Sequence, residues 1–590
     1  MKTIKIFILA LIAGMSIASC DFLEKEPNQI TPGNYFKTPG EASSFLTGVY
    51  ATLQQSTFYG NAYLYLVGGD DLGHYGGVGR TPNKTGLICN NATSSDPDVL
   101  GFWYTLYTGI NRANVFLENI DAVPDMDKDL RLQYKAEARF LRAFFYFNLV
   151  QCWGDVPFTT ESTVDPENLA RPRTDKQQIY DFIVREMAGS SNDLKSSSDL
   201  NYLPGRVSKS AAWGILARVY MFRAGEHFRD NKASDPVTEK EYFKKASHYA
   251  QLVLKEGHDL DNNYWDLFID LCSNKYNSSG KNESIWEVEF AGNRSTDVRA
   301  EGRIGNIIGI VGPDLSATSY KGQEDPGFGY GFIYSTPKLL DLYEANNDKN
   351  RCNWSIAPFT YTQSKKGGAV DGRYFEYGKM DEVKNQYWDI SYSYGPEGSI
   401  TTTDPETGKT ETKRYGDYEK TKTSSDNNRN RACAKYRREY EADKKSKNDT
   451  SINFPILRFS DILLMIAEAE NEVNGAPNTL AYDCINRVRR RAGIEELKDL
   501  DYSQFLSKLK DERAMELCFE YTRRFDLIRW GEYIEKMNEL VSVAQAGGSW
   551  TQGATNVYNY FNISSAYNYF PIPAQEMAMN PFITENNPKW

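Results

Sequence analysis

The sequence is poor in the residues and motifs on which enzyme active sites are commonly built. It contains only four histidines, none at a metal-ligand spacing, and it has no GxSxG, HExxH or phosphate-binding P-loop motif. One class of enzyme stays open, because a glycoside hydrolase or lyase needs carboxylates that are close in space, which sequence spacing does not identify. These absences favour a binding protein, and no catalytic residue is predicted.

Metal and redox motifs are also scarce. The stretch "DMDKDL" begins like a calcium loop, but Leu130 stands where the loop needs glycine and Ala136 where it needs a bidentate glutamate. The eight cysteines include no CxxC pair, and Cys152, Cys484 and Cys518 lie in helical patterns, where they are expected to be small buried apolar residues. No cofactor and no metal site is predicted, and whether a calcium ion assists stays open.

Positive charge and long apolar runs are lacking too. The formal net charge of −11 argues against a nucleic-acid partner, which requires a basic face. The one apolar run near the start, residues 6–13, is shorter than the roughly 20 residues that span a bilayer. Residues 1–19 are therefore predicted to be a secretory signal, and Ile17 to Cys20 resemble a bacterial lipobox with Cys20 as the lipidated residue. The alternative is an ordinary cleaved signal with a chance cysteine.

What the chain has in excess is aromatic residues and helical periodicity. Aromatic residues make up 13% of the sequence, with 39 tyrosines. Apolar residues recur every three or four positions in several segments, which predicts a helical scaffold made of helix pairs that resemble tetratricopeptide units. The segments are 130–158, 208–225, 241–257, 459–475, 478–493 and 506–531. Trp213, Trp265, Trp286 and Trp530 lie in helix or strand patterns and are predicted to be core residues.

Six quoted segments share one resemblance: "AEARFLRAFFYFNLVQCWGDVPF", "AAWGILARVYMFRAG", "PILRFSDILLMIAEAENEVNG", "INRVRRRAG", "ERAMELCFEYTRRFDLIRWG" and "YNYFPIPAQEMAMNPFITENNPKW". In this order they are similar to the RagB/SusD family of Bacteroidetes outer-membrane lipoproteins. The family usually has Glu-Gly-His-Arg where this chain has Glu520, Tyr521, Thr522 and Arg523, a departure that bears on local packing of the scaffold.

The resemblance implies a mainly α-helical fold and a function. The chain would be a non-catalytic, surface-exposed lipoprotein of the outer membrane that captures oligosaccharide and delivers it to a SusC-like TonB-dependent transporter. Some relatives bind peptides, which is the alternative cargo. The expected organisation is a signal peptide at 1–19, an N-terminal region at 20–270 with a ligand loop near 60–103, and a C-terminal region at 271–590. The C-terminal region would hold a loop excursion at 290–435 and the helical scaffold at 455–531.

The predicted ligand-binding residues come from aromatic- and glycine-rich loops. A sugar presents weakly apolar faces and a rim of hydroxyls, so its binding site needs flat aromatic rings beside polar side chains. In the glycine-rich stretch the candidates are Asp70, Asp71, His74, Tyr75, Arg80 and Asn83. The resemblance implies a second loop after "ESIWEVEF", with Arg294, Arg303, Tyr320 and Tyr330. For each tyrosine the alternative is that it packs its own loop. Arg489, Arg490 and Arg491 are predicted to be a helix C-terminal charge cluster rather than an anion site.

Overall fold

The structure is a computed structural model in which most of the chain is described. The described residues are 35–61, 63, 69–75, 86–163, 165, 169–276, 282–290, 302–310, 312, 327–356, 431–441, 447–545 and 558–590, with the backbone of short strands between 359 and 414. The predicted signal peptide and Cys20 lie outside these residues. Within the described residues, no helix combines the length and the apolar character that crossing a bilayer requires.

The fold is mainly helical, as predicted, and the N-terminal part is built on two long helices. Helix α4 (Pro97–Asn119) packs against α5 (Lys128–Trp153). The two helices approach closely at Gly109, where an added Cβ would lie 2.5 Å from the Phe145 ring. Asp127 caps the start of α5 by accepting a hydrogen bond from the Leu130 N–H at 2.9 Å, so this aspartate of the acidic run has a structural role.

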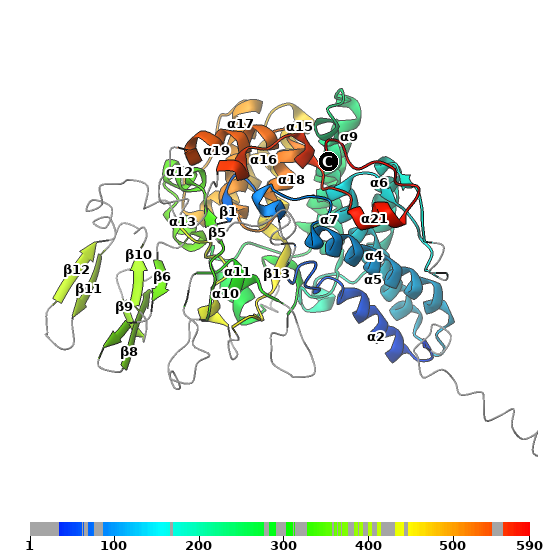
Figure 1. Ribbon diagram of the computed structural model, residues 1–590, viewed down its shortest axis with the longest axis horizontal. Helices are drawn as coiled ribbons and strands as arrows, with labels where there is room; N and C mark the ends of the chain where they lie inside the picture. The colour runs from blue at the N-terminus through cyan, green and yellow to red at the C-terminus, as the bar shows by residue number, and fades with distance from the viewer. Residues whose placement is uncertain are drawn as a thin grey trace, which may run out of the picture.

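The scaffold consists of helix pairs, as the periodicity predicts. Helix α7 (Lys209–Ala224) packs on α9 (Pro236–Val253), and α15 (Phe459–Asn474) packs on α16 (Thr479–Ala492) and on α9. The small side chains of Ala246 and Ala250 are buried on α9. Figure 1 shows these helices as one body, with the short strands β6 to β12 to one side.

The predicted helical segment 506–531 forms two helices rather than one. Helix α17 (Tyr502–Leu517) and helix α18 (Arg523–Arg529) are separated by a tight turn. Phe519 and Tyr521 adopt left-handed backbone conformations in that turn, with φ of 60° and 63°. Non-glycine residues seldom adopt positive φ, so apolar periodicity alone does not reveal this break.

The other helices complete the body around the long pairs. Their bounds are α2 Pro39–Tyr50, α6 Lys176–Ser190, α8 Glu226–Asp230, α10 Asp266–Ser273, α11 Ile304–Ile307, α12 Pro337–Ala345, α13 Lys349–Ser355, α19 Tyr533–Gln545, α20 Tyr558–Phe561 and α21 Ala574–Met579.

The strands are short and pair in small antiparallel sheets. Strand β4 (Ser284–Val288), which the "SIWEVEF" pattern predicts, pairs with β13 (Phe454–Arg458). The other pairs join β1 (Gly73–Tyr75) to β5 (Ile333–Ser335) and β2 (Val156–Pro157) to β3 (Arg173–Thr174). In the excursion the strands are β6 Phe359–Thr362, β7 Ser364–Lys366, β8 Ala369–Phe375, β9 Val383–Gln386, β10 Asp389–Tyr392, β11 Ser399–Thr403 and β12 Thr410–Arg414.

The core contains one of the four tryptophans predicted for it, and the other three pack against it. Trp286 is fully buried, and Trp213, Trp265 and Trp530 are partly buried against the core. Cys152, Cys484 and Cys518 are buried free thiols, as expected of small apolar residues. Burial raises the pKa of the Cys152 thiol to about 12, so this thiol is neutral at physiological pH.

Candidate functional site

The β1–β5 pair brings two of the predicted loops together. His74 on β1 lies opposite Tyr334 on β5, and their rings are 6.0 Å apart. The pairing is extended by Thr336, whose N–H donates to the carbonyl of Leu72 at 2.8 Å. Antiparallel neighbours place their side chains side by side, so residues from both loops share one surface here.

Four aromatic rings follow one another from the end of β1 along the segment that leads into β5, and we call them the aromatic row: Tyr75, Phe332, Tyr330 and Phe328. The Tyr75 and Phe332 ring centroids are 5.5 Å apart. Phe332 and Tyr330 are stacked at 4.8 Å with planes 10° apart, and Phe328 meets Tyr330 edge-on at 4.6 Å. Tyr75 is buried, whereas the other three rings are half-buried and alternate with buried residues, as side chains of an extended segment do.

Backbone hydrogen bonds from a neighbouring segment hold the aromatic row in place. The Tyr330 N–H donates to the carbonyl of Asn306 at 2.8 Å, and the Phe332 N–H donates to that of Ile307 at 2.9 Å. The Asn306 amide donates to the Phe328 carbonyl at 3.2 Å, and Arg303 donates to the Asn306 amide oxygen at 3.3 Å. The rings are therefore presented on a braced backbone, and Arg303 acts through Asn306.

Asp71 has a structural position in the interior. Its carboxylate is fully buried and accepts hydrogen bonds from Arg523 at 2.8 and 2.9 Å and from Lys338 at 2.5 Å. Burial opposes its ionisation, but these two cations outweigh it and hold the pKa of Asp71 well below its usual range. The prediction of a ligand contact therefore lacks support at Asp71, since its carboxylate already binds two cations and has no exposed surface.

Asp70 behaves in the opposite way although it is the next residue. Burial raises the pKa of the Asp70 carboxyl to about 7, and the negative charge of Asp71 adds to the shift. One of its oxygens accepts the N–H groups of Leu72 and Gly73 at 2.9 and 3.1 Å, which forms the turn before β1. Asp70 therefore shapes the turn that leads into the aromatic row.

The other predicted ligand residues divide into described and undescribed ones. His74 is buried between the strands, with 2% of its surface exposed, and Tyr75 with 3%. Tyr330 is half-buried in the aromatic row. Outside the described residues lie Arg80, Asn83, Arg294 and Tyr320.

Phe328, Phe332 and Asn306 are not among the ligand-binding candidates predicted from the sequence, although they form or support the aromatic row. A signal for the two phenylalanines exists, because the stretch "FGYGFIY" places an aromatic residue at every second position from Phe328 to Tyr334. Period-two alternation is the pattern of a strand with one exposed face. Nothing local marks Asn306, whose role depends on carbonyls at Phe328 and Lys447 that are distant in sequence.

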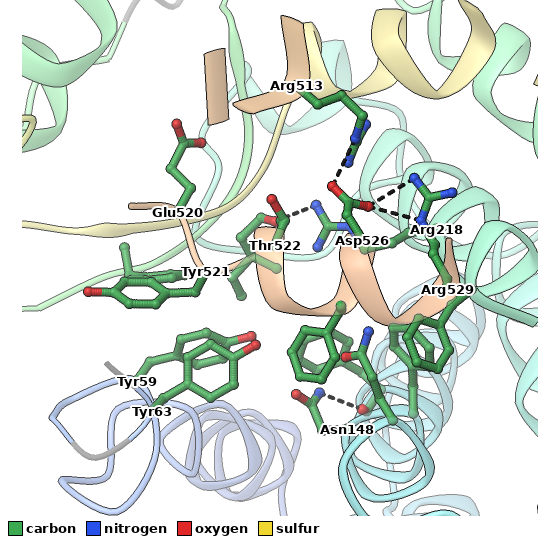
Figure 2. A pocket seen from close by; sticks show the side chains of 17 residues that line it. Tyr59, Tyr63, Asn148, Arg218, Arg513, Glu520, Tyr521, Thr522, Asp526 and Arg529 are labelled. Carbon is green, nitrogen blue, oxygen red and sulfur yellow. Dashed lines mark hydrogen bonds and ion pairs between the residues drawn. The ribbon is translucent and has the colours of Figure 1, made fainter. Parts of the chain in front are cut away.

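A small cavity lies near the start of α18. Figure 2 shows the rings of Tyr59 and Tyr63 facing the ring of Tyr521, with Arg513 and Asp526 farther along the cavity. Its volume is about 40 Å³, which suffices for a few water molecules but not for a sugar. This cavity is therefore part of the scaffold.

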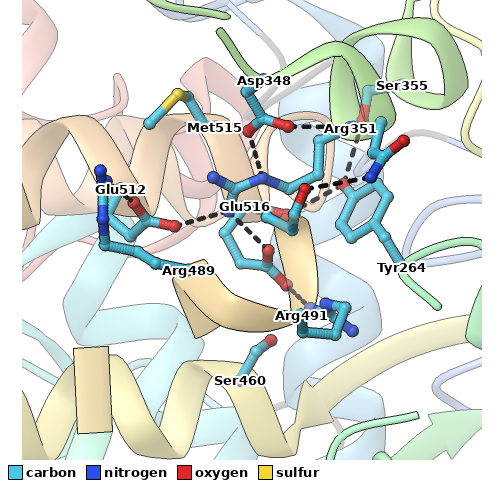
Figure 3. A network of polar contacts seen from close by, with 12 residues as sticks. Tyr264, Asp348, Arg351, Ser355, Ser460, Arg489, Arg491, Glu512, Met515 and Glu516 are labelled. Carbon is cyan, nitrogen blue, oxygen red and sulfur yellow. Dashed lines mark hydrogen bonds and ion pairs between the residues drawn. The ribbon is translucent and has the colours of Figure 1, made fainter. Parts of the chain in front are cut away.

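The predicted arginine cluster at the end of α16 is confirmed as structural. All three arginines lie in the last turn of the helix, where cations are favourable. Arg489 pairs with Glu512 at 2.7 Å, and Arg491 pairs with Glu283 at 2.7 Å and with Glu516 (Figure 3). Arg490 is half-exposed and pairs with Glu496 at 2.9 Å. Within the described part of the chain, no group of three or more His, Cys, Asp or Glu side chains is placed to hold a metal ion.

The chain matches two described protein families. Residues 282–590 match the "SusD family", and residues 21–221 match the family described as "Starch-binding associating with outer membrane". SusD-like protein P25 of Formosa agariphila is 26% identical to the chain over 97% of this chain and 96% of that protein. Starch-binding protein SusD of Bacteroides thetaiotaomicron is 23% identical over 81% of this chain and 76% of that protein.

Solved structures agree with this fold. A SusD homolog from Bacteroides thetaiotaomicron is similar with a TM-score of 0.76 at 26% identity, over 96% of this chain and 100% of that one. A laminarin-binding SusD-like protein is similar with a TM-score of 0.62 at 21% identity, over 94% of this chain and 100% of that one. At that lower identity the likeness shows the fold alone.

Proposed function

This chain belongs to the SusD family, and from that premise we propose that it is a non-catalytic, cell-surface glycan-binding lipoprotein. It captures oligosaccharides and delivers them to a SusC-like TonB-dependent transporter in the outer membrane. Cys20 carries the lipid anchor in this proposal. An anchored protein stays at high effective concentration beside its transporter, so it can open and close over it without being lost.

The aromatic row is the observation that carries the proposal. Three of its rings are half-buried on a braced backbone, so one side of the row remains accessible. Flat rings bind the apolar faces of sugars, and judged from pairs of aromatic rings each contact is worth about 0.5 to 1.5 kcal/mol beyond the area that it buries. A few such contacts give weak binding, which suits a protein that must release its cargo. Arg80, Asn83, Arg294 and Tyr320 stay proposed as polar and aromatic partners of the row.

A binding experiment with a built-in test for catalysis decides between the alternatives. The chain without residues 1–20 is applied to a glycan array and to a peptide panel, and incubated with laminarin, xyloglucan and starch oligosaccharides. We expect binding to at least one glycan and no change in oligosaccharide length. Binding to peptides alone would replace the cargo in the proposal, and shortened oligosaccharides would show a hydrolase or lyase.

Tyr330 is the described residue whose replacement best tests the site. Tyr330→Ala removes the central ring of the half-buried part of the row, so we expect the affinity for the bound oligosaccharide to fall roughly three- to tenfold. Tyr249→Ala on α9 is the matched control, since it removes another half-buried tyrosine away from the row. Equal affinity of both variants and the wild type would show that the row is not the binding surface.

A further inference from the structure

A groove apart from the aromatic row is formed by three parts of the chain: α4, the segment that follows β2, and α21. Its volume is about 220 Å³, below the roughly 300 Å³ at which pockets for drug-sized ligands begin, so it suits one ring better than a chain. Figure 1 shows α21 lying across α4, at a distance from the β1–β5 pair. The Ala574 N–H, at the start of α21, donates to the Ser94 carbonyl at 2.8 Å, which holds the two walls together.

Three half-buried aromatic residues line this groove: Tyr104, Tyr107 and Phe158. Tyr104 and Tyr107 are three residues apart on α4 and therefore share a helix face. The Tyr107 hydroxyl donates to the Pro157 carbonyl at 2.7 Å, and the Phe158 ring packs on Tyr146 at 4.9 Å. Because their neighbours fix these two rings, little conformational freedom would be lost when a ligand binds.

Polar side chains stand around the aromatic floor. Glu161, Arg171 and Glu576 line the groove with carboxylates and a guanidinium. Burial raises the pKa of the Tyr104 hydroxyl, and the negative charge of Glu576 adds to the shift, so this carboxylate acts on the tyrosine from the facing wall. Hydrogen-bond acceptors and donors therefore lie around the aromatic side chains of the groove. A sugar requires this combination, because it has apolar faces and a rim of hydroxyls.

The rim of the groove exposes more apolar surface than a solvent-facing segment needs. Leu169, Met579 and Phe582 are 55%, 67% and 59% exposed. Leu169 and Asn580 line the groove, Met579 and Phe582 are close to Asn580 in sequence, and the Asn580 amide donates to the Arg171 carbonyl at 2.9 Å. Clustered exposed apolar side chains mark interaction sites more often than scattered ones do.

A larger cavity of about 650 Å³ near α6 and α8 fits a ligand less well. Lys176 pairs there with Glu226 at 2.6 Å and with Asp230 at 2.7 Å, while Arg229 donates to the Val150 and Gln151 carbonyls at 2.9 and 2.8 Å. These groups already bind one another and the backbone. The smaller groove offers more aromatic surface for its size.

We propose that the groove between α4 and α21 is a second saccharide-binding subsite, which takes one ring of a neutral oligosaccharide on Tyr104 with Glu161, Arg171 and Glu576 at the ring's hydroxyls. The proposal rests on the proposed glycan-binding function and adds a site that is separate from the aromatic row. Two weak sites on one chain raise retention on a polysaccharide through effective concentration, without tight binding at either.

The test counts bound oligosaccharides per chain. Equilibrium dialysis with laminarin, xyloglucan and starch oligosaccharides is run on the wild type and on Tyr104→Ala, Tyr330→Ala and the control Tyr249→Ala. We expect two bound molecules for the wild type and the control. At ligand concentrations near the wild-type dissociation constant, Tyr104→Ala and Tyr330→Ala should each bind fewer, because one of their two sites is weakened roughly three- to tenfold. Tyr104→Phe keeps the ring and should retain both. Glu576→Gln, a nearly isosteric change, should lower the affinity of the second site severalfold, and it replaces Tyr104→Ala if that variant does not fold.

The two proposals fail in different ways. If Tyr104→Ala and Glu576→Gln bind as much oligosaccharide as the wild type while Tyr330→Ala binds less, the second subsite is wrong and the proposed function stands. If Tyr330→Ala changes nothing and Tyr104→Ala removes binding, the groove is the binding site and the assignment to the aromatic row is wrong. If the wild type binds none of the three oligosaccharides and no glycan on the array, both proposals are overturned.

Discussion

The ion pairs around Glu516 consist of buried charged side chains, whereas the aromatic row consists of uncharged rings, three of which are partly exposed. Glu516 is fully buried on α17 and is contacted by three arginines from other elements: Arg351 at 2.8 Å, Arg458 at 2.6 Å and Arg491 (Figure 3). The aromatic row consists of one buried ring, Tyr75 on β1, and three half-buried rings in the segment that leads into β5. Buried ion pairs therefore join the elements of the scaffold, whereas the proposed binding site needs aromatic rings that stay partly exposed.

One short turn joins these two regions. Glu520, between α17 and α18, accepts hydrogen bonds from Arg458 and Lys435 on the scaffold side. Three residues later Arg523 binds Asp71, next to β1. An added Cβ at Gly73 would lie 3.1 Å from the Phe519 ring, so the turn also packs directly on the strand. Breaking the buried ion pairs of the scaffold should therefore lower stability more than relieving the backbone of this turn.

The largest expected effect is that of removing the charge of Glu516. Burial opposes its ionisation, but the three guanidinium groups hold the pKa of Glu516 well below its usual range, so it is charged at neutral pH. Glu516→Gln removes the carboxylate that the three arginines share, although each keeps another partner: Asp348 for Arg351, and Glu283 for Arg458 and Arg491. Breaking a buried ion pair costs about 3 to 5 kcal/mol. We expect a large fall in the melting temperature, measured by circular dichroism.

A surface glutamate provides the matched control for that variant. Glu496 pairs with Arg490 at 2.9 Å, but both side chains are 50% exposed. An exposed pair contributes about 0 to 1 kcal/mol, so Glu496→Gln should change the melting temperature little. Equal shifts for the two variants would contradict the distinction between buried and exposed charge on which the comparison depends.

Replacing an aspartate by asparagine should lower the stability of the protein at position 71 and raise it at the adjacent position 70. Asp71→Asn breaks buried ion pairs with Arg523 and Lys338, so we expect a loss of about 3 kcal/mol at pH 7. The depressed pKa of Asp71 means that its contribution is present above the unfolded value near pH 4 and is lost as the pH falls below it.

Asp70→Asn keeps the acceptor oxygen of the turn and removes a carboxyl whose pKa is raised to about 7. Between about pH 4 and pH 7 the folded protein holds a proton that the unfolded chain has released, so this carboxyl lowers stability as the pH rises through that window. We therefore expect Asp70→Asn to melt higher than the wild type at pH 8 and at nearly the same temperature at pH 4. A melting curve series that shows no pH dependence of this difference would contradict the charge argument.

The helices were predictable because their signals are local. Apolar spacing is read within a few residues of the helix that it defines, and the predicted segment 130–158 covers most of α5, Lys128–Trp153. The site is different, since Asp71 and Arg523 are 452 residues apart in sequence. A buried aspartate next to a glycine-rich stretch looks the same in sequence as an exposed one. The grouping of Tyr75 with Tyr330 likewise depends on strand pairing that periodicity does not specify.

The smallest difference is expected between two variants of Tyr521, a buried residue in the turn between α17 and α18. The residue has a φ of 63°, which costs a non-glycine residue roughly 1 to 2 kcal/mol, yet its buried ring stacks on Phe454 at 5.9 Å. Both Tyr521→Ala and Tyr521→Gly lose the ring, but only glycine relieves the backbone. We therefore expect the glycine variant to be more stable by about 1 kcal/mol, measured by thermal denaturation.

The two Tyr521 variants are informative because glycine should be more stable than alanine there, the reverse of the order inside a helix. At Ser44, an exposed position inside α2, the same two substitutions should rank the other way, because alanine is favoured over glycine in a helix by about 1 kcal/mol. If alanine is the more stable variant at both positions, the turn at Tyr521 carries no backbone strain. If the order reverses as expected, the ring of Tyr521 offsets a strained conformation at the joint between scaffold and site, which explains how this chain accommodates tyrosine there.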